Sequence, residues 1–391
     1  MDGSRIAETP VTALDVPEEL IRRFASRAAE SDRLGEIGFD NLSDLHEAGY
    51  LGLTLPASRG GKSITLRQIT RIVSQVAKGD PSTALILAMQ YLQTVAILLS
   101  DTWPDDVRNE VIDSIVNSGA LVNALRVEPE LGTPARGGIP ATRVRREGDR
   151  YFLSGRKIFS TGSSALHWGV VWGATEEETP RIGQILVPLS LPGVRIEKSW
   201  HQLGMRATGS DTIIFEAVEI PERYLINFHE SGQNPETPVL ATWHTVVIPA
   251  LYNAIAHSAR EWLIGFLEGR VPTALGRPLS TLPRFHAVIG EIDGLLLTNQ
   301  ALLDFALAKA ENQTISLTEA GQIKRLVTEN AIAAVARAVE VTGNPGLSQD
   351  NPLERHYRNV LCGRIHTPQA DAVLEGAGRE GFSVFRSKTE D

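Results

Sequence analysis

The hydrophobic pattern of this 391-residue chain changes its period twice. Apolar residues recur at helical spacing over residues 17–119, at the spacing of short strands over residues 121–222, and at helical spacing again from residue 238. Because a helix and a strand each bury the face that their own period creates, the chain cannot form a uniform helical array or an all-β sandwich. The pattern predicts an α+β multidomain fold in the order helices, strands, helices.

The chain is also longer than most single compact domains. We expect three domains: an N-terminal helical domain over residues 1–120, a middle β domain over residues 121–225 and a C-terminal helical domain over residues 226–391. Asp80 followed by Pro81 is a helix start signal in the first domain. Turn residues separate the strands of the second domain, and the long helices of the third carry apolar residues that suit a bundle.

The composition of the chain indicates which kinds of molecule it can bind. Lys+Arg 38 against Asp+Glu 47 gives a formal net charge of -9, which disfavours nucleic acid and anionic membrane surfaces. The single cysteine, Cys362, excludes an internal disulfide framework and a cysteine-rich metal site. The N-terminus lacks the pattern of a signal peptide, and the longest apolar tract, residues 82–99, is interrupted by Gln90 and Gln93. We expect a cytoplasmic protein that binds a small molecule, without a metal, nucleic acid or membrane.

Several common enzyme signatures are missing. The sequence has no GxGxxG after a strand, no GxxxxGK[ST], no HExxH and no GxSxG. This disfavours the usual nicotinamide, phosphate-loop, zincin and α/β-hydrolase sites. The stretch "SRGGKS" at residues 58–63 lacks the spacing of a phosphate loop, and turn chemistry explains its glycines.

Two motifs at predicted strand ends are more informative. "RVEPELGT" (residues 126–133) and "GRKIFSTGSS" (residues 155–164) place glycine and small hydroxyl residues where strands finish. Such ends present backbone N–H groups and hydroxyls to a flat polar ligand, and the pyrimidine edge and N5 of a flavin need these donors. The alternative is a pair of hairpin turns rich in serine and threonine, which by pattern alone are commoner.

Segments from most of the chain carry a further similarity. They are "GYLGLTLPASRGG", "VEPELGT", "GDRYFLSGRKIFSTG", "WHQLGMRATGSDTIIFEAVEIPERYLI" and "NPLERHYRNVLCG". In this order they resemble the acyl-CoA dehydrogenase superfamily. The resemblance implies an N-terminal helical domain, a middle β-barrel-like domain and a C-terminal four-helix bundle that usually assembles as a homotetramer. It also implies FAD or FMN between the β domain and the bundle, with a neighbouring subunit completing the site.

The resemblance assigns residues to the cofactor. Val127 and its neighbours line the pyrimidine side, Thr133 lies near the pyrophosphate, and Thr161 lies near flavin N5. The turn "GNPG", residues 343–346, meets the flavin of the partner subunit. The full set expected at the cofactor is Arg126, Val127, Thr133, Phe159, Ser160, Thr161, Gly343, Asn344 and Gln369.

The catalytic carboxylate of a dehydrogenase is not at either expected position. Counting from Arg358 puts Thr367 where the family has its glutamate. The other known position, in the first bundle helix, falls near Leu240, with Glu236 about a turn upstream. Removing the α-proton of an acyl thioester requires a carboxylate within hydrogen-bond reach, and Thr367 cannot act as that base. Glu375 could be a displaced base, although an exposed position is expected for it.

A second branch of the superfamily fits the C-terminal motif better. The flavin-dependent monooxygenases similar to dibenzothiophene monooxygenase end the last helix in an "HTxH" segment, and "RIHTPQ" keeps His366 and Thr367 with Gln369 at the second histidine's place. Because the ordinary pKa of histidine is near neutrality, His366 could hold a proton and take one back during oxygen chemistry. We therefore expect His366 and Thr161 to be catalytic. The alternative for His366 is a structural histidine at the helix end.

Four residues are candidates for substrate contact: Gln90, Trp243, His244 and Ser210. A buried glutamine with satisfied hydrogen bonds is an equal alternative for Gln90, and core or interface packing is an alternative for Trp243 and His244. The expected function is a reduced-flavin, O₂-dependent monooxygenase acting on a small, partly apolar substrate, with a flavin reductase as partner. The alternatives are an FAD-dependent acyl-CoA dehydrogenase and a non-catalytic flavin- or acyl-binding paralogue.

Overall fold

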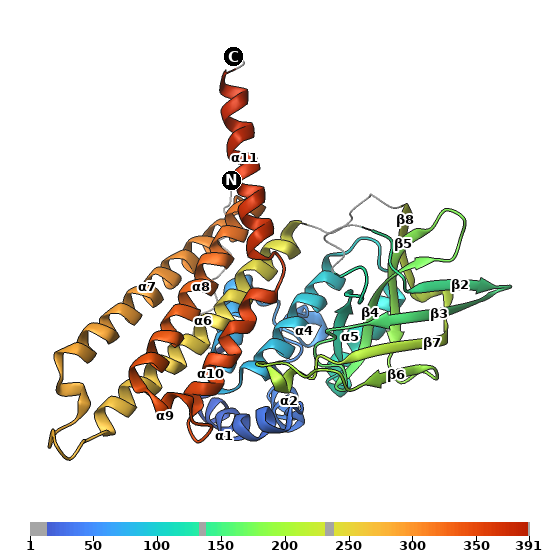
Figure 1. The fold of residues 1–391 in the computed structure, drawn as a ribbon. Helices are drawn as coiled ribbons and strands as arrows, with labels where there is room; N and C mark the ends of the chain where they lie inside the picture. Colours follow the sequence, from blue (N-terminus) through green and yellow to red (C-terminus); the bar gives the residue numbers. More distant parts are fainter. Residues whose placement is uncertain (1–13, 133–137, 231–237, 390–391) are drawn as a thin grey trace, which may run out of the picture.

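The computed structural model describes residues 14–132, 138–230 and 238–389. In Figure 1 the strands gather at one end of the molecule and the long C-terminal helices at the other. Helices of the N-terminal region lie between these two parts and contact both. The predicted order of helices, strands and helices is confirmed.

Five α-helices form most of the N-terminal region. They are α1 (Glu18–Leu34), α2 (Phe39–Glu47), α3 (Leu66–Gly79), α4 (Pro81–Leu99) and α5 (Asp105–Ser118), with the short 3₁₀ helix η2 (Ala57–Arg59) before α3. Helix α4 begins at the predicted signal, because the Asp80 carboxylate accepts hydrogen bonds from the backbone N–H groups of Ser82 (3.1 Å) and Thr83 (3.3 Å). Pro81 occupies the first turn.

Among the described residues, two helices are long and apolar enough to cross a membrane by length and composition, α4 and residues 239–269 of α6 (Pro238–Gly269). Inside the fold, 78% and 72% of these stretches are buried. α4 packs against α3, α6 and strand β1 (Leu121–Leu125), which explains why it is apolar on all sides. Both helices therefore have the burial of core helices.

The strands form one sheet. After β1 they are β2 (Arg143–Glu147), β3 (Arg150–Lys157), β4 (Leu166–Thr175), β5 (Arg181–Pro188), β6 (Val194–Glu197), β7 (Thr212–Ile220) and β8 (Leu225–Glu230), with the 3₁₀ helices η4 (Arg206–Thr208) and η5 (Glu222–Tyr224). The strand order is β6-β7-β3-β2-β4-β5-β8, and β1 pairs in parallel with β4. Strand β8 extends the sheet beyond the predicted domain boundary at residue 225 and was not expected from the sequence.

The C-terminal region is built on α6, α7 (Pro283–Glu311), α8 (Leu317–Thr342) and α10 (Pro352–Leu361). Helix α6 packs against the other three, which gives the four-helix bundle. The short elements η6 (Leu279–Thr281), α9 (Asn344–Leu347) and η7 (Cys362–Ile365) connect these helices, and α11 (Ala370–Thr389) projects from the body of the molecule.

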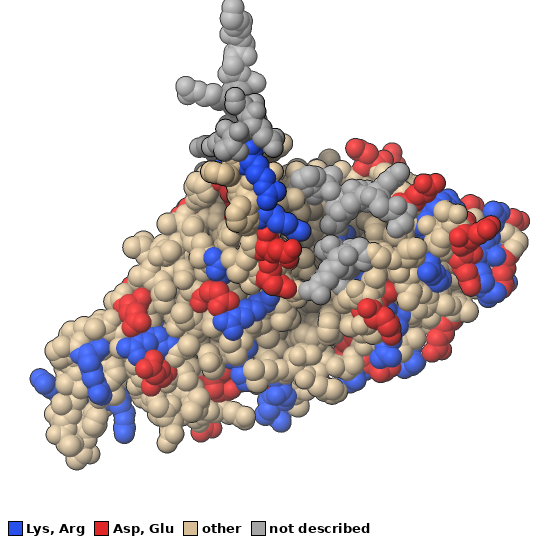
Figure 2. All heavy atoms as spheres, turned by 45° about the horizontal axis from the view of Figure 1, so that its top comes forward, with Lys and Arg blue, Asp and Glu red and all other residues tan. Residues whose placement is uncertain are grey.

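The buried apolar side chains form one cluster that runs from Val16 through the sheet to Val360 in α10. The three regions therefore share a core, and the relative positions of sheet and bundle are fixed by packing. On the face shown in Figure 2, basic and acidic side chains are interspersed, most densely over the strands. The described side chains on that face form no extended basic surface.

Candidate functional site

Arg126 lies at the end of β1, on the side of the sheet from which its charge reaches the bundle. Arg126 directly follows β1, and its guanidinium carbon lies 6.0 Å from the ring centroid of Trp172 in β4. After burial and Lys324, the charge of Arg126 also lowers the pKa of His244 on α6, so the two side chains are within electrostatic reach of each other. Burial lowers the pKa of Arg126 itself to about 10. Two predicted site residues from different regions are thus brought together.

The end of β3 carries a strained aromatic residue. Phe159 has a φ of 58° and its side chain is 54% exposed, with its ring 6.1 Å from that of Trp200 in an edge-on contact. A left-handed conformation is unfavourable for a bulky residue and persists only where its surroundings enforce it. Here the backbone N–H groups of Ser160 and Gly162 donate to the carbonyls of Asp211 (3.2 Å) and Thr208 (2.9 Å). These bonds fix the backbone of the turn, from which the exposed Phe159 ring projects.

A chain of hydroxyl groups begins beside this turn. The Thr161 and Ser210 hydroxyl oxygens are 3.1 Å apart, those of Ser210 and Thr208 are 2.8 Å apart, and the Thr208 hydroxyl donates to the Met205 carbonyl (2.8 Å). Because a carbonyl only accepts, Thr208 uses its proton there, so Ser210 donates to Thr208 and Thr161 donates to Ser210. The Thr161 oxygen keeps lone pairs that can accept a hydrogen bond from a ligand.

The same loop is anchored to the bundle. The Met205 N–H donates to Oδ1 of Asn359 in α10 at 2.7 Å. An added Cβ on Gly204 would lie 2.1 Å from the carbonyl oxygen of Arg358, so the loop and the helix are in direct backbone contact. Since α10 leads into the turn that contains His366, the two predicted catalytic residues lie on elements that are held against each other.

His366 contacts α6 from the end of α10. Its Nε2 lies 2.8 Å from the hydroxyl oxygen of Tyr252, a fully buried residue. Burial, His244 and Lys324 lower the pKa of His366 to about 3. The imidazole is therefore neutral at physiological pH, which corrects the expectation that its pKa is near neutrality. A neutral imidazole can donate one hydrogen bond and accept another, but it does not carry a proton in reserve.

His244 lies beside His366, with the ring centroids 6.2 Å apart. Burial, Lys324 and Arg126 lower the pKa of His244 to about 4, and a hydrogen bond to the Thr367 backbone opposes this shift. The charges that act on the two histidines are thus cations, and within the described part of the chain no carboxylate contributes to either pKa. The site offers neutral nitrogen donors and positive charge.

Other predicted residues lie in varied places. Val127 follows β1 and lies beside the end of β3, where its carbonyl accepts from the Ile158 N–H at 2.9 Å. Trp243 is half-buried and packs against the core, and Gln369 is half-buried just before α11. Thr133 and Glu236 lie outside the described residues.

Gln90 has a structural role in the described fold. Its side chain is 1% exposed, its carbonyl oxygen accepts from the Val122 N–H at 2.8 Å, and its amide donates to the Ala120 carbonyl at 3.4 Å. Both ends of the amide therefore tie α4 to β1. This arrangement matches the alternative to substrate contact, a buried glutamine whose hydrogen bonds are satisfied within the fold.

Gly343 and Asn344 lie far from His366 within one chain. Lys324 of α8 contacts the His366 backbone, and Gly343 follows 19 positions later at the other end of the same helix, about 28 Å away at the helical rise. These residues do not join the site described above. A role at a partner subunit's cofactor stays a prediction.

Three functional candidates were not foreseen from the sequence: Tyr252, Lys324 and the ion pair of Glu128 with Lys157. Tyr252 is two helical turns from His244, a spacing that could have placed it on the same face. Glu128 and Lys157 are both buried, 2.6 Å apart, and Glu128 also accepts from the backbone N–H groups of Ala141 (2.7 Å) and Thr142 (3.0 Å). This pair fixes the "VEPE" segment against the end of β3.

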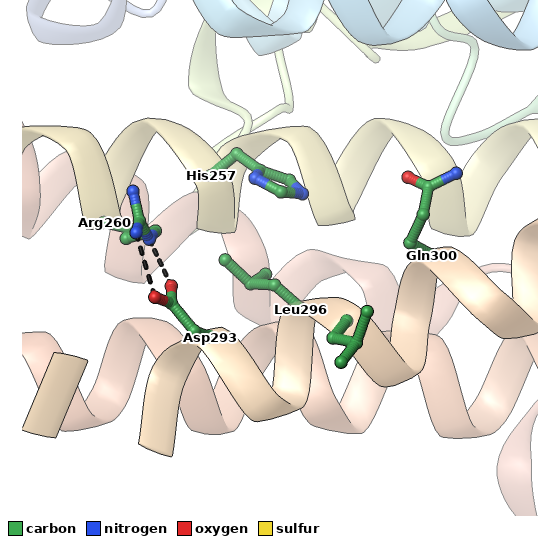
Figure 3. A pocket seen from close by; sticks show the side chains of 6 residues that line it. His257, Arg260, Asp293, Leu296 and Gln300 are labelled. Carbon is green, nitrogen blue, oxygen red and sulfur yellow. Dashed lines mark hydrogen bonds and ion pairs between the residues drawn. The ribbon is translucent and has the colours of Figure 1, made fainter. Parts of the chain in front are cut away.

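A separate hollow of about 300 Å³ is lined by residues of α6 and α7. Figure 3 shows it between α6 and α7, with the Arg260 guanidinium paired to the Asp293 carboxylate and with His257 and Gln300 at its rim. It contains none of the predicted site residues. We assign the candidate site to the junction of sheet and bundle instead.

The polar and apolar groups at the junction of sheet and bundle are of the kinds that a flavin needs. The Ser160 hydroxyl is buried and has no hydrogen-bond partner among the described residues, which leaves it available for a polar ligand edge. The Thr161 oxygen can accept, Phe159 offers an apolar ring, and Arg126 provides positive charge. A flat ring system with one apolar side and one polar edge matches these groups.

Comparisons with known proteins give a consistent result. Family models of the acyl-CoA dehydrogenase N-terminal, middle and C-terminal domains match residues 15–102, 126–218 and 248–369. The acyl-CoA dehydrogenase-like protein YdbM of Bacillus subtilis is 32% identical over 363 residues, which cover 92% of this chain and 93% of YdbM. L-evernosamine nitrososynthase of a Micromonospora species is 26% identical, with 93% and 88% of the two chains covered.

Solved structures agree on the fold. Butyryl-CoA dehydrogenase from Megasphaera elsdenii superposes with a TM-score of 0.82 at 19% identity, covering 93% of this chain and 96% of its own. TdsC from Paenibacillus sp. A11-2, in complex with FMN and indole, gives a TM-score of 0.80 at 19% identity, with 91% and 94% covered. The predicted fold class is confirmed.

Proposed function

The chain belongs to the acyl-CoA dehydrogenase family, and from this membership and the candidate site we propose that it is a flavin-dependent monooxygenase. It uses reduced FMN or FAD and O₂ to oxidise a small, partly apolar substrate. A separate flavin reductase supplies the reduced flavin. The observation that carries this proposal is the set of groups around His366.

Dehydrogenation of an acyl thioester needs a base for the α-proton. Thr367 has no carboxylate, and Glu375 is exposed on α11 and 3.4 Å from Arg379. Neutral histidines with strongly lowered pKa values are weak bases. Within residues 14–132, 138–230 and 238–389, the groups that act on His366 therefore favour an anion and do not favour removal of a carbon-bound proton.

The protein's own residues have distinct roles in this proposal. Reduced flavin, when bound, supplies two electrons to O₂, so that one oxygen atom enters the substrate and the other leaves as water. His366 donates a hydrogen bond to the oxygen on which negative charge develops, and Lys324 and Arg126 add positive charge nearby. Thr161 and Ser160 bind the polar edge of the cofactor, and Phe159 packs on its apolar part.

The relatives support two functions. TdsC with FMN and indole, and the nitrososynthase, support the monooxygenase proposal by analogy. YdbM, the relative at 32% identity, favours the alternative of an FAD-dependent acyl-CoA dehydrogenase. In that alternative Glu236, about a turn upstream of the family position near Leu240 and outside the described residues, is the candidate base.

One experiment separates the two. The purified protein is loaded with FMN or FAD and mixed anaerobically with saturated acyl-CoA thioesters, and a second sample with a flavin reductase, NADH and ¹⁸O₂ is given indole and other small apolar heterocycles. We expect no bleaching of the flavin by acyl-CoA, and one ¹⁸O atom in a product. Bleaching by acyl-CoA that is lost in Glu236→Gln would establish the dehydrogenase instead.

A further inference from the structure

Lys324 of α8 binds the turn that carries His366. Its ammonium donates to the backbone carbonyls of His366 (2.6 Å) and Pro368 (2.9 Å). The carbonyl between them belongs to Thr367, whose backbone is bonded by His244 of α6. The backbone of this turn is therefore bound by two side chains from two helices, Lys324 of α8 and His244 of α6.

This turn has little room to move. An added Cβ on Gly363, just before the turn, would lie 2.8 Å from the Thr328 side chain of α8. An added Cβ on Gly321 of α8 would lie 3.1 Å from Val373, just after the turn. Helix α8 thus packs closely on both sides of the segment, and Lys324 lies between these two contacts.

The charge of Lys324 is unusual for a purely structural donor. The side chain is 3% exposed, and within the described residues it forms no ion pair with a carboxylate. Burying an unpaired cation is costly, whereas a neutral amide could donate to the same two carbonyls at a lower cost. The positive charge instead acts on His366 and His244, the two nitrogen donors of the site.

We propose that Lys324 is a positioning residue for His366, which fixes the turn through its carbonyls and whose positive charge favours an anion beside the imidazole. The inference rests on the proposed function for the identity of that anion, the reacting oxygen. The hydrogen bonds between Lys324 and the turn do not depend on the proposed function. No catalytic contact with substrate is assigned to Lys324.

Three variants of the chain separate the effect of the hydrogen bonds that Lys324 donates from the effect of its positive charge. Lys324→Met removes both and keeps an unbranched apolar chain. Lys324→Gln keeps an amide that can donate to the two carbonyls and removes only the charge. Lys309→Met is the matched control, because the Lys309 ammonium of α7 bonds the Glu319 carboxylate of α8 at 2.6 Å and donates to neither of the two carbonyls of the turn.

The main measurement is ¹³Cε1-histidine NMR, with the His366 signal identified by its loss in His366→Gln. Loss of the nearby cation in Lys324→Met and Lys324→Gln should raise the pKa of His366 by about one unit, and Lys309→Met should not change it. Coupling of O₂ consumption to product should fall about tenfold in Lys324→Met and less in Lys324→Gln. Folded variants with an unchanged His366 pKa overturn the proposal.

A measurement on the wild-type protein covers the case in which neither variant folds. Burial lowers the pKa of Lys324 to about 8, so the His366 signal should show a step near pH 8 as Lys324 loses its proton. Absence of any such step in the alkaline range over which the protein stays folded overturns the proposal. If the protein binds no flavin but the NMR effects remain, the proposed function fails while the positioning role stands.

Discussion

The hydroxyl of Tyr252 lies 2.8 Å from Nε2 of His366, across 114 positions of sequence. Tyr252 is fully buried and burial holds its pKa well above its ordinary value, so it keeps its proton. Among the described residues its hydroxyl has no other hydrogen-bond acceptor, so Tyr252 donates to Nε2. The proton of the neutral His366 ring is therefore on Nδ1, which is the atom that can donate to a ligand.

Tyr252→Phe should remove the hydrogen bond that keeps the His366 proton on Nδ1. We expect a loss of about 1 kcal/mol in unfolding free energy, from one buried hydrogen bond, and a fall in the fraction of O₂ that yields product. Urea unfolding and hydrogen peroxide release measure the two effects. Tyr91→Phe is a matched control, because Tyr91 is equally buried and donates to the Tyr50 carbonyl at 2.7 Å. The control should lose similar stability without extra peroxide; equal peroxide from both variants would contradict the assignment.

His366→Phe should leave the fold and flavin affinity nearly intact. It removes the donor beside developing negative charge while filling the same space, so product per O₂ should fall by about 100-fold, with peroxide rising to match. Flavin titration and an oxygen electrode check both parts. Unchanged coupling in a folded, flavin-bound variant would remove His366 from the mechanism.

Thr367→Glu tests whether a carboxylate at position 367 is sufficient to restore dehydrogenation of an acyl thioester. The Thr367 side chain is exposed, so a longer carboxylate fits without displacing core residues. If the candidate site accepts thioesters, this variant should gain bleaching of bound FAD by acyl-CoA, since it restores a base at the family position. Stopped-flow absorbance measures the rate, with Thr367→Gln as the control that has the same size and no charge. Equal bleaching by both variants would show that the added carboxylate is not the cause.

Thr161→Val tests the hydroxyl chain. It is nearly isosteric and removes the oxygen that accepts from a ligand, so flavin affinity or the oxidative rate should fall about tenfold. Ser210→Ala keeps the Thr161 hydroxyl but frees its proton, and should produce a smaller change. Thr94→Val, which loses a 2.7 Å bond to the Gln90 carbonyl within α4, is the control. An effect of the control as large as that of Thr161→Val would indicate general loosening of the fold.

The pH dependence of stability follows from three histidines. Burial lowers the pKa of His244 to about 4 and those of His356 and His366 to about 3. Below the ordinary value of about 6.5 the unfolded chain binds protons that the folded chain does not, so stability falls as pH drops from about 6.5 toward these values. Urea unfolding between pH 7.5 and pH 5 measures this slope. His356→Leu should flatten it, and an unchanged slope would show that His356 is not buried as a neutral ring.

The order of elements could be read from the sequence because it depends on local chemistry. Asp80 and Pro81 define the start of α4 through contacts within one turn, and the period of apolar residues separates helices from strands. The strand-end motif around Phe159 and Thr161 was also visible, since glycine and hydroxyl residues mark where a strand finishes. Strand β8 was missed because a short edge strand is defined by its pairing with β5 rather than by its own pattern.

The tertiary structure alone decided which side chains meet. Whether Gln90 faced a cavity or the β1 backbone depended on the rotation of α4 against the sheet, and the bond between Tyr252 and His366 depended on the register of α6 against α10. It also decided the protonation of His366, because the pKa of an imidazole is set by burial and by cations such as Lys324, which lies 42 positions away in sequence. Local sequence patterns determine where helices and strands form. The pKa of a side chain also depends on its burial and on the charges around it, and these are set only when the helices and strands have packed together.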